Sequence, residues 1–407
     1  MNIFLTFALL LISESYAQSL GKEVLERNLS IQSYQLSKEA EEVKTGHLNR
    51  SFLPTVMMEL GQERFQTGTY SSRSEPYGLL EARFNLFRGG RDRIRSQMVD
   101  LQAQIAEHNK NLAIRSDLSK VRKLQFQIIF HNELIALLEK EKKENLQILR
   151  QAQKRASSGV STKSDSLEFN IYDLELTEKI ESLNHENKIL KIGLLPLLGL
   201  TEIEDLKFQE KLEHQHDDQF LERQFAFRNH PLVASLDAEH ENFNFQKKAN
   251  ELWWTPNLDL YGGYYLYTLR DRDYIPIGER EDRVFGVRLS FLLFDGLAGH
   301  NLASSNHYQG EAKRLMARHT ERQTEAQFLM LKEELKHTHE VMHYVLERIN
   351  KSREYLRLTL FEYDRGVKNS LDALLAMQRY YRYEKEYLEK KKEYQLIKTD
   401  LLALLGE

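Results

Sequence analysis

The chain has 407 residues, of which none is cysteine and only 6 are proline. Without cysteine it has no disulfide, thiolate metal site, cysteine nucleophile or lipid-modified N-terminal cysteine. Its formal net charge of −4 gives no overall basic field, so nucleic acid is not an expected partner. Charged residues make up 29% of the chain, and together with the scarcity of proline this favours long exposed helices over a compact enzyme.

Long apolar runs are scarce as well. The run from Ile3 to Ile12 is too short to cross a bilayer, and Ser15-Tyr16-Ala17 after it is an A-x-A-like cleavage site. We therefore predict a secretory signal peptide at 1–17; no Lys or Arg precedes the run, and a buried N-terminal helix is the alternative. No other segment reaches the roughly 18 apolar residues of a membrane helix. The sequence thus predicts an exported protein without a helical membrane anchor.

Several landmarks recur at one offset along the chain. Gly159 and Asp165 in "RASSGVSTKSD" lie 207 positions before Gly366 and Asp372 in "DRGVKNSLD" (366 − 159 and 372 − 165). The same offset relates Phe87 and Gly89 to Phe294 and Gly296, and Gly199 to Gly406. We therefore predict an internal duplication: a signal peptide at 1–17, a first repeat over 18–200, a charged linker at 201–218 and a second repeat over 219–407.

Each half contains two runs of alternating apolar and polar residues, which predict β-strands. The expected strands lie near 52–62, 77–87, 256–266 and 283–294. Leu80 and Phe84 share one face of the first half, and Phe285, Val287 and Leu289 share one face of the second; Glu81, Arg83 and Arg288 fall on the opposite faces. The length of about 10 residues suits a tilted membrane strand, with an ordinary solvated hairpin as the alternative.

Two long helices are expected over 91–157 and 296–363, because neither region contains proline and apolar residues recur at three- and four-residue steps. Such helices bury their apolar stripe only by packing as coiled coils. Their expected partners are shorter helices at about 20–48, 163–198, 219–252 and 369–405. Gly159 and Gly366 would form the hairpin turns, whereas Gly89, Gly90 and Gly296 would join strand to helix.

The duplication, "NLFRGGR" (85–91), the two glycine turns followed by aspartate and the Leu-Leu-Gly ends are similar to those of the TolC-like outer-membrane efflux family. The resemblance covers nearly all of the predicted mature chain. It departs in "LLFDGLAGH", which lacks the Gly-Gly-Arg of the first repeat, and in "RNLSI", which lacks the proline of "RNHPL".

The resemblance implies a mainly α protein with a membrane β-barrel contribution. Long coiled-coil hairpins and four strands per chain would form a 12-stranded barrel and a helical tunnel in a homotrimer. It implies an exit duct in the outer membrane, extending into the periplasm, for tripartite efflux or type I secretion. The partners would be outer-membrane lipid, a periplasmic adaptor (membrane fusion protein) and an inner-membrane pump of the RND or ABC type. No cofactor is implied, and the sequence leaves drugs, metal ions and proteins open as cargo.

Site residues follow from the same resemblance. Asp372 matches an acidic ring that narrows the periplasmic entrance of such channels and favours cations; Asp165 is its counterpart in the first repeat, and Lys163 and Lys368 lie in the same turns. The alternative is that both aspartates cap helices. On the strands, Leu80, Phe84, Phe285, Val287 and Leu289 would face lipid.

The segment "THEVMHYV" contains His339-Glu340-x-x-His343, the spacing of zinc metalloproteases. It lacks the Gly and third His of the extended motif, and its match in the first half, "NELIA", has no histidine. We therefore expect no catalytic zinc site and no enzyme, leaving an incidental metal at the i, i+4 pair as an alternative. A soluble periplasmic coiled-coil adaptor is the alternative for the whole protein.

Overall fold

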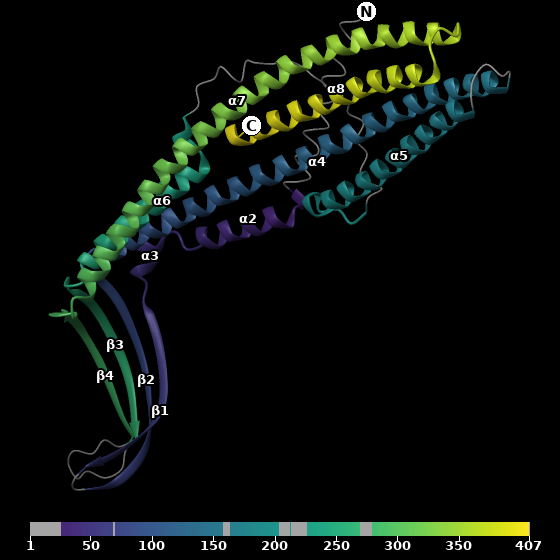
Figure 1. Cartoon of the computed structure of the whole chain (residues 1–407). Helices are drawn as coiled ribbons and strands as arrows, with labels where there is room; N and C mark the ends of the chain where they lie inside the picture. Colours follow the sequence, from purple (N-terminus) through teal and green to yellow (C-terminus); the bar gives the residue numbers. More distant parts are fainter. Residues whose placement is uncertain are drawn as a thin grey trace, which may run out of the picture. The chain divides into compact units, whose positions relative to one another are not determined.

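The computed structural model describes residues 26–67, 70–157, 163–202, 212, 226–268 and 279–406. The predicted signal peptide, Gly159 and most of the predicted linker lie outside the described residues. Figure 1 shows the helices and strands with their labels. In chain order they are α2 (Leu29–Glu42), α3 (His47–Ser51), β1 (Thr55–Thr67), β2 (Tyr70–Arg88), α4 (Arg91–Ser157), α5 (Lys163–Leu198), a 3₁₀ turn (Phe227–Asn229), α6 (Pro231–Glu251), β3 (Asn257–Thr268), β4 (Glu279–Ser290), α7 (Ala298–Asp364) and α8 (Ser370–Leu405).

The long elements repeat at the offset seen in the sequence. Helices α4 and α7 both have 67 residues, and α5 and α8 both have 36. Their first residues are 207 positions apart in each pair (298 − 91 and 370 − 163). The predicted mainly helical fold with four strands is confirmed. None of the described helices is both long and apolar enough to span a membrane.

Several predicted boundaries are wrong. Strand β1 runs to Thr67 and β2 begins at Tyr70, so the first hairpin is longer than the expected 52–62 and 77–87. The first helix is expected to run to about residue 48, but α2 ends at Glu42. Gly46, with a left-handed φ of 73°, precedes the separate short helix α3. Helix α6 begins at Pro231. Proline suits the first helical position, because an N–H there would have no hydrogen-bond partner within the helix. Strand β4 ends at Ser290, which pairs with Asn257, the first residue of β3. Residues 291–294 therefore have no β3 residue to pair with.

Two compact units divide the described chain, and each contains parts of both repeats. One unit, spanning residues 1–35, 110–230 and 320–407, holds α5, α8, and the parts of α4 and α7 that follow residues 109 and 319. Its largest core cluster joins all four helices through buried side chains such as Ile148, Phe169, Val345 and Tyr381. Leu212 of the predicted linker is also buried there, packed with α4 and α5 side chains, so this part of the segment is not solvated.

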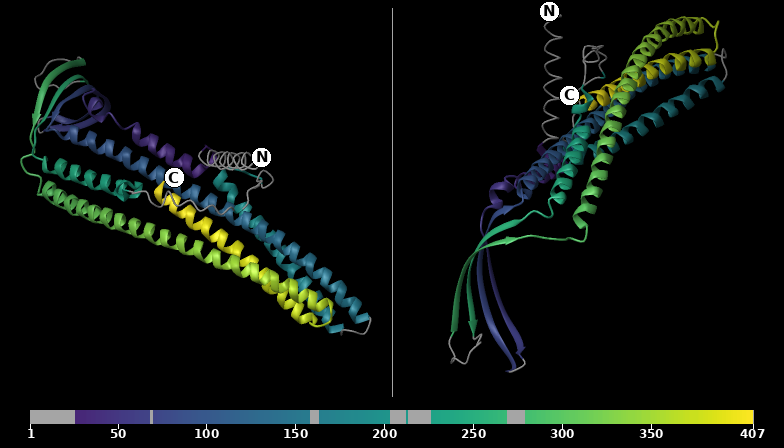
Figure 2. Two further views of the ribbon diagram at one scale, coloured as in Figure 1. Left: turned by 90° about the horizontal axis from the view of Figure 1, so that it is seen from above. Right: turned by 90° about the vertical axis from the view of Figure 1, so that its left-hand side faces the viewer.

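The other unit, spanning residues 36–109 and 231–319, holds the sheet and the helical segments next to it. Helix α6 packs on the start of α4 through Ala238 and Phe245 against Leu101 and Ile105. The four strands form one antiparallel sheet in the order β1-β2-β3-β4, and they lie side by side in both views of Figure 2. The central β2–β3 pairing therefore joins the two repeats.

Candidate functional site

The turn between α7 and α8 has a well-defined backbone. Gly366 has a φ of 78° and donates its N–H to the Tyr363 carbonyl at 2.9 Å, and the Val367 N–H reaches the Glu362 carbonyl at 2.9 Å. These two bonds form a Schellman motif, in which the left-handed residue is usually glycine. Gly366 thus follows the end of α7, and its left-handed backbone turns the chain back towards α8.

Asp372 lies at the start of α8 and takes part in a capping box. Its backbone N–H donates to the Asn369 side chain at 2.8 Å, and its carboxylate accepts from the Asn369 N–H at 3.3 Å. Asn369 is therefore the N-cap, and Asp372 is the third residue of the helix rather than the cap itself. The Asp372 carboxylate is partly exposed, so it can complete the capping box and also present its charge to solvent.

The other predicted turn residues are placed in less detail. Lys163 and Asp165 belong to the first turn of α5. Lys368 is partly buried in the second turn. That these lysines could pair with Asp165 and Asp372 in the same turns stays a prediction.

An arginine–tyrosine contact that the sequence reasoning missed joins the two hairpins near their turns. Arg155, at the end of α4, donates to the backbone carbonyl of Tyr363 at the end of α7, and its guanidinium lies 4.6 Å from the Tyr363 ring centroid. The Tyr363 ring is buried, and its hydroxyl lies 3.4 Å from that of Ser370. The duplication does not indicate this contact, because Arg155 occupies the position that matches Glu362 in the second repeat.

The strand-to-helix turns differ between the repeats. Gly89 and Gly90 have φ values of 64° and 79°, and a Cβ on Gly89 would lie 1.8 Å from the Thr255 hydroxyl. In the second repeat Gly296 has a φ of 67°, but the next residue is Leu297, with a φ of 66°. Leu297 thus adopts the left-handed backbone of Gly90 with a side chain that disfavours it. The second turn keeps its geometry despite the missing glycine.

The sheet has one apolar face and one polar face. Leu80 and Phe84 on β2, and Phe285, Val287 and Leu289 on β4, are all exposed on the same face. Val56, Met58 and Leu60 of β1 and Leu260 of β3 continue that face.

On the opposite face, polar and aromatic side chains meet. Arg83 donates to Glu81 at 2.8 Å, and the Arg288 guanidinium lies 4.6 Å from the Tyr261 ring centroid. Glu81 is buried on this face, and the ion pair with Arg83 satisfies its charge.

His339 and His343 lie on α7 within the helical unit and line a hollow beside α8, together with Met342 and Tyr387. Among the described residues, no group of three or more His, Asp or Glu side chains is arranged to hold a metal ion. The apolar stripe predicted around them includes buried Leu335, Val345 and Ile349.

No family model matches the chain, and no curated protein sequence is significantly similar to it. Its structure is nevertheless similar to several solved channels. The outer-membrane channel OprN has a TM-score of 0.81 at 14% identity, over 96% of this chain and 89% of that chain. VceC, an outer membrane protein of Vibrio cholerae, has a TM-score of 0.80 at 12% identity, over 96% of both chains. The open state of the MtrE outer membrane channel of Neisseria gonorrhoeae has a TM-score of 0.77 at 17% identity, over 96% and 88%. The chain has the fold of these outer-membrane channels, and the predicted TolC-like fold is confirmed.

Proposed function

We propose that this chain is one subunit of a homotrimeric outer-membrane exit channel, in which three sheets close a 12-stranded barrel and the helices form a periplasmic tunnel. One observation carries the proposal: a four-stranded sheet with open edges and an apolar outer face, in a chain that overlaps outer-membrane channels over 96% of its length. The chain consists of two repeats, 18–200 and 219–407, each contributing one β-hairpin and one helical hairpin.

The sheet supports closure between copies. Within the described residues, β1 and β4 each have a neighbour on one side only. Open strand edges are not tolerated in lipid, because their N–H and C=O groups would lack partners. Four strands are too few to close a barrel, whereas twelve leave room for a passage. Pairing β1 of one copy with β4 of the next satisfies both edges.

The apolar residues of the sheet support a lipid-facing role. Phe285 is 84% exposed, although its side chain is wholly apolar. Beyond the end of β4, Phe291, Leu292, Leu293 and Phe294 are all exposed as well. A lipid environment or a neighbouring copy would cover these side chains, and a solvated hairpin would leave them in water.

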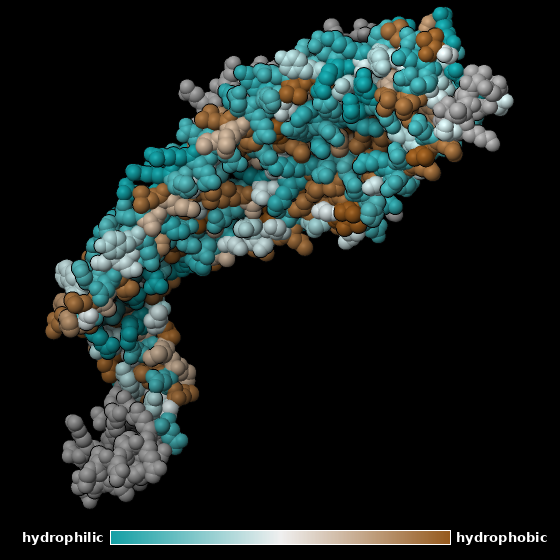
Figure 3. Space-filling model, in the orientation of Figure 1, coloured by the Kyte–Doolittle hydropathy of each residue, from teal (hydrophilic) through white to brown (hydrophobic). Residues whose placement is uncertain are grey.

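The helical unit also carries apolar side chains that the described chain does not cover. Exposed residues on α5 include Leu167, Ile171, Leu174, Ile189 and Ile192. Figure 3 shows hydrophobic side chains in brown exposed among hydrophilic ones in teal. A helical tunnel built from three copies would bury them at its subunit contacts, as coiled coils do.

The hairpin turns would form the periplasmic end of the tunnel. Three copies of Asp372 form an acidic ring there, with Asp165 and the lysines Lys163 and Lys368 nearby. The Arg155–Tyr363 contact holds the two hairpins of one subunit together at this end. A periplasmic adaptor docks on the helices, and an inner-membrane pump of the RND or ABC type supplies the energy. The chain itself has no catalytic role in this proposal.

Cysteine cross-linking tests the subunit arrangement, because the chain has no cysteine of its own. Met58→Cys on β1 would be combined in turn with Phe285→Cys, Val287→Cys or Leu289→Cys on β4. Oxidation in intact cells should give a covalent trimer for at least one combination. The matched control is Leu80→Cys with Tyr264→Cys, which are paired within one chain and should give only cross-linked monomer.

Two results would overturn the channel. One is a monomer in every β1–β4 combination while the control pair cross-links. The other is recovery of the protein in the soluble periplasmic fraction without detergent, which would favour a periplasmic adaptor.

The acidic ring has a separate test in planar bilayers. Asp372→Asn removes the charge but keeps an oxygen that can accept from the Asn369 N–H. We expect a lower cation preference for this variant, and a native preference for Asp372→Glu. An unchanged cation preference in Asp372→Asn would leave Asp372 as part of the capping box only.

A further inference from the structure

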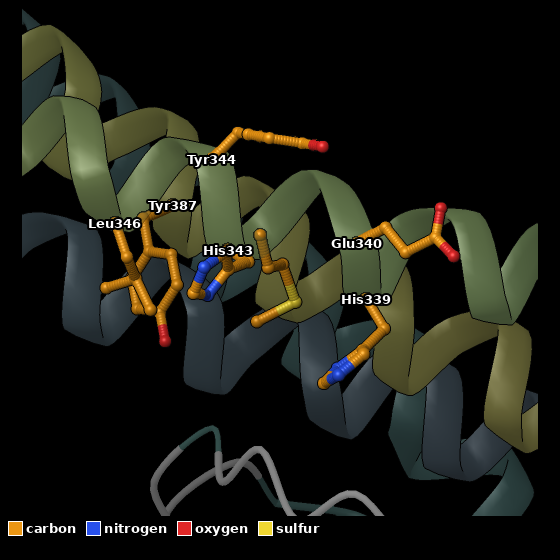
Figure 4. A pocket seen from close by; sticks show the side chains of 7 residues that line it. His339, Glu340, His343, Tyr344, Leu346 and Tyr387 are labelled. Atoms are coloured by element: carbon orange, nitrogen blue, oxygen red, sulfur yellow. The ribbon is translucent and has the colours of Figure 1, made fainter.

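Two histidines of α7 lie beside a hollow of about 480 Å³ at the seam between α7 and α8. Its lining comprises His339, Glu340, Met342, His343, Tyr344, Leu346 and Tyr387. Figure 4 shows the rings of His339 and His343 on the same side of α7 as Leu346 and Tyr387, whereas Tyr344 projects from the other side. The hollow therefore has two imidazoles along one wall.

The helix fixes the spacing of the two Cβ atoms from which the rings extend. Residues four apart on an α-helix are neighbours on its surface, with Cβ atoms about 5–6 Å apart. The rotation of α7 is set by its core: Met342 is 2% exposed and Val345 is 0% exposed. With these side chains inside, His339 is left partly buried and His343 exposed at the edge of the same stripe.

We propose that His339 and His343 together bind one divalent late transition-metal cation, such as Zn²⁺, Ni²⁺ or Cu²⁺, through one ring nitrogen each. Imidazole is a preferred ligand of these ions, and Cu²⁺ binds such donors most strongly in the series. Since the described residues supply no group of three His, Asp or Glu donors, water completes the coordination. The site is therefore an open two-ligand site rather than a catalytic zinc centre.

The surroundings suit a cation. Glu340 is among the residues that line the hollow, although its carboxylate extends away from the two rings in Figure 4. Tyr387 also lines the hollow, and its phenol can hydrogen-bond a coordinated water. The matching positions of α4 are Asn132 and Ala136, so each chain has one such pair. The site rests on α7 and its neighbours and is independent of the proposed channel.

Zinc titration of the full chain by calorimetry tests the site. We expect one binding site that His339→Ala or His343→Ala each weakens roughly tenfold or more, since even outer partners of metal ligands contribute 10–100-fold. The matched control is His337→Ala, an exposed histidine on the same helix outside the hollow, which should leave the affinity unchanged. Circular dichroism of each variant should show native helix content.

A second measurement counts the ligands. The electron paramagnetic resonance spectrum of the Cu²⁺-loaded chain should show coupling to two imidazole nitrogens, and to one in either single variant. Unchanged zinc affinity in the double variant H339A/H343A would overturn the proposal, as would an equal loss in His337→Ala.

Discussion

The long helices α4 and α7 have the same length and bury polar side chains at matching positions, but the chemistry of those side chains differs. At three pairs of positions related by the 207-residue offset, α4 buries Asp117, His131 and Asn145, and α7 buries Thr324, Thr338 and Ser352. The first repeat thus buries side chains with two polar atoms each, whereas the second repeat buries side chains with a single hydroxyl.

The hydroxyls of α7 can find partners inside their own helix. Thr324 donates to the Thr320 carbonyl at 2.8 Å, and Ser352 donates to the Ile349 carbonyl at 3.0 Å. The polar groups of α4 reach other elements instead. Asp117 accepts from Asn28 at 3.1 Å, and the remaining two bond across to α5.

This difference determines how firmly each helix is held. Directional bonds from α4 to its neighbours fix both its rotation and its register, because a shift would leave buried polar groups without partners. Helix α7 is held by apolar packing and by partly exposed pairs such as Arg348–Glu386 and Arg353–Glu384. Small shifts of α7 against α8 therefore cost less than shifts of α4 against α5.

The contrast is sharpest at one matching pair, where Glu141 of α4 corresponds to Arg348 of α7. Glu141 is fully buried, accepts from the Tyr172 hydroxyl of α5 and pairs with Lys385 of α8 at 2.7 Å. We expect Glu141→Ala to lower the free energy of unfolding by about 3 kcal/mol, the low end for breaking a buried pair, because Lys385 is partly exposed and can regain water.

Arg348→Ala is the matched control, since its pair with Glu386 is partly exposed and we expect it to cost about 0.5 kcal/mol. Urea unfolding followed by circular dichroism in detergent measures both. Equal losses in the two variants would remove the proposed asymmetry between α4 and α7.

The next effect concerns Asn145, whose side-chain amide donates to the Phe169 carbonyl of α5 at 2.9 Å. Its replacement by alanine should cost about 1–2 kcal/mol, because it removes a buried hydrogen bond and leaves space. Ser352→Ala at the matching position should cost about 0.5 kcal/mol, since its bond stays within α7. The same unfolding experiment compares them, and a larger loss for Ser352→Ala would contradict the prediction.

A substitution in the second strand-to-helix turn should raise the free energy of unfolding, whereas the substitutions above lower it. Leu297→Gly should stabilise the protein by about 0.5–1 kcal/mol, because relief of the left-handed backbone outweighs the added freedom of the unfolded chain. Gly90→Leu, the reciprocal change, should destabilise it, since Gly90 has open space around it but a φ of 79°. Thermal denaturation followed by circular dichroism measures the change in melting temperature for both variants. A lower melting temperature for Leu297→Gly would contradict the predicted backbone strain at Leu297.

The smallest effect depends on pH. Burial lowers the pKa of His131 below the ordinary 6.5, against the opposing influence of Glu186 and Asn187 on α5; Lys179 on α5 and Lys392 on α8 lower it further. A histidine with a lowered folded pKa contributes its full stability above 6.5 and loses it as the pH falls below that value, because the unfolded chain takes up the proton first.

We therefore expect the melting temperature to fall less between pH 7.5 and 5.5 in His131→Gln than in the unchanged chain. His230, whose pKa is also lowered by burial, leaves a residual dependence. Thr338→Val, at the matching position of α7, should keep the full pH dependence. An identical pH profile for His131→Gln would show that His131 does not couple to folding.

Much of this architecture could be predicted from sequence because it depends on local patterns. Gly366 marks a helix end wherever it lies, and the alternation in 283–290 indicates a strand without knowledge of its partner. The bonds that distinguish α4 from α7 could not be predicted in this way. Whether Glu141 meets Lys385 depends on the rotation and register of two helices more than 240 positions apart (385 − 141), which the periodicity of either helix leaves free.

The pairing of β2 with β3 has a consequence for the order of folding. It joins Arg88 to Asn257, which are 169 positions apart (257 − 88), whereas β1–β2 and β3–β4 are local hairpins. Contacts between distant positions form slowly, because a long loop must close before they contribute free energy. The helical hairpins and the two β-hairpins should therefore form first. The four-stranded sheet should assemble last, after α4 and α5, which lie between β2 and β3 in the sequence, have folded.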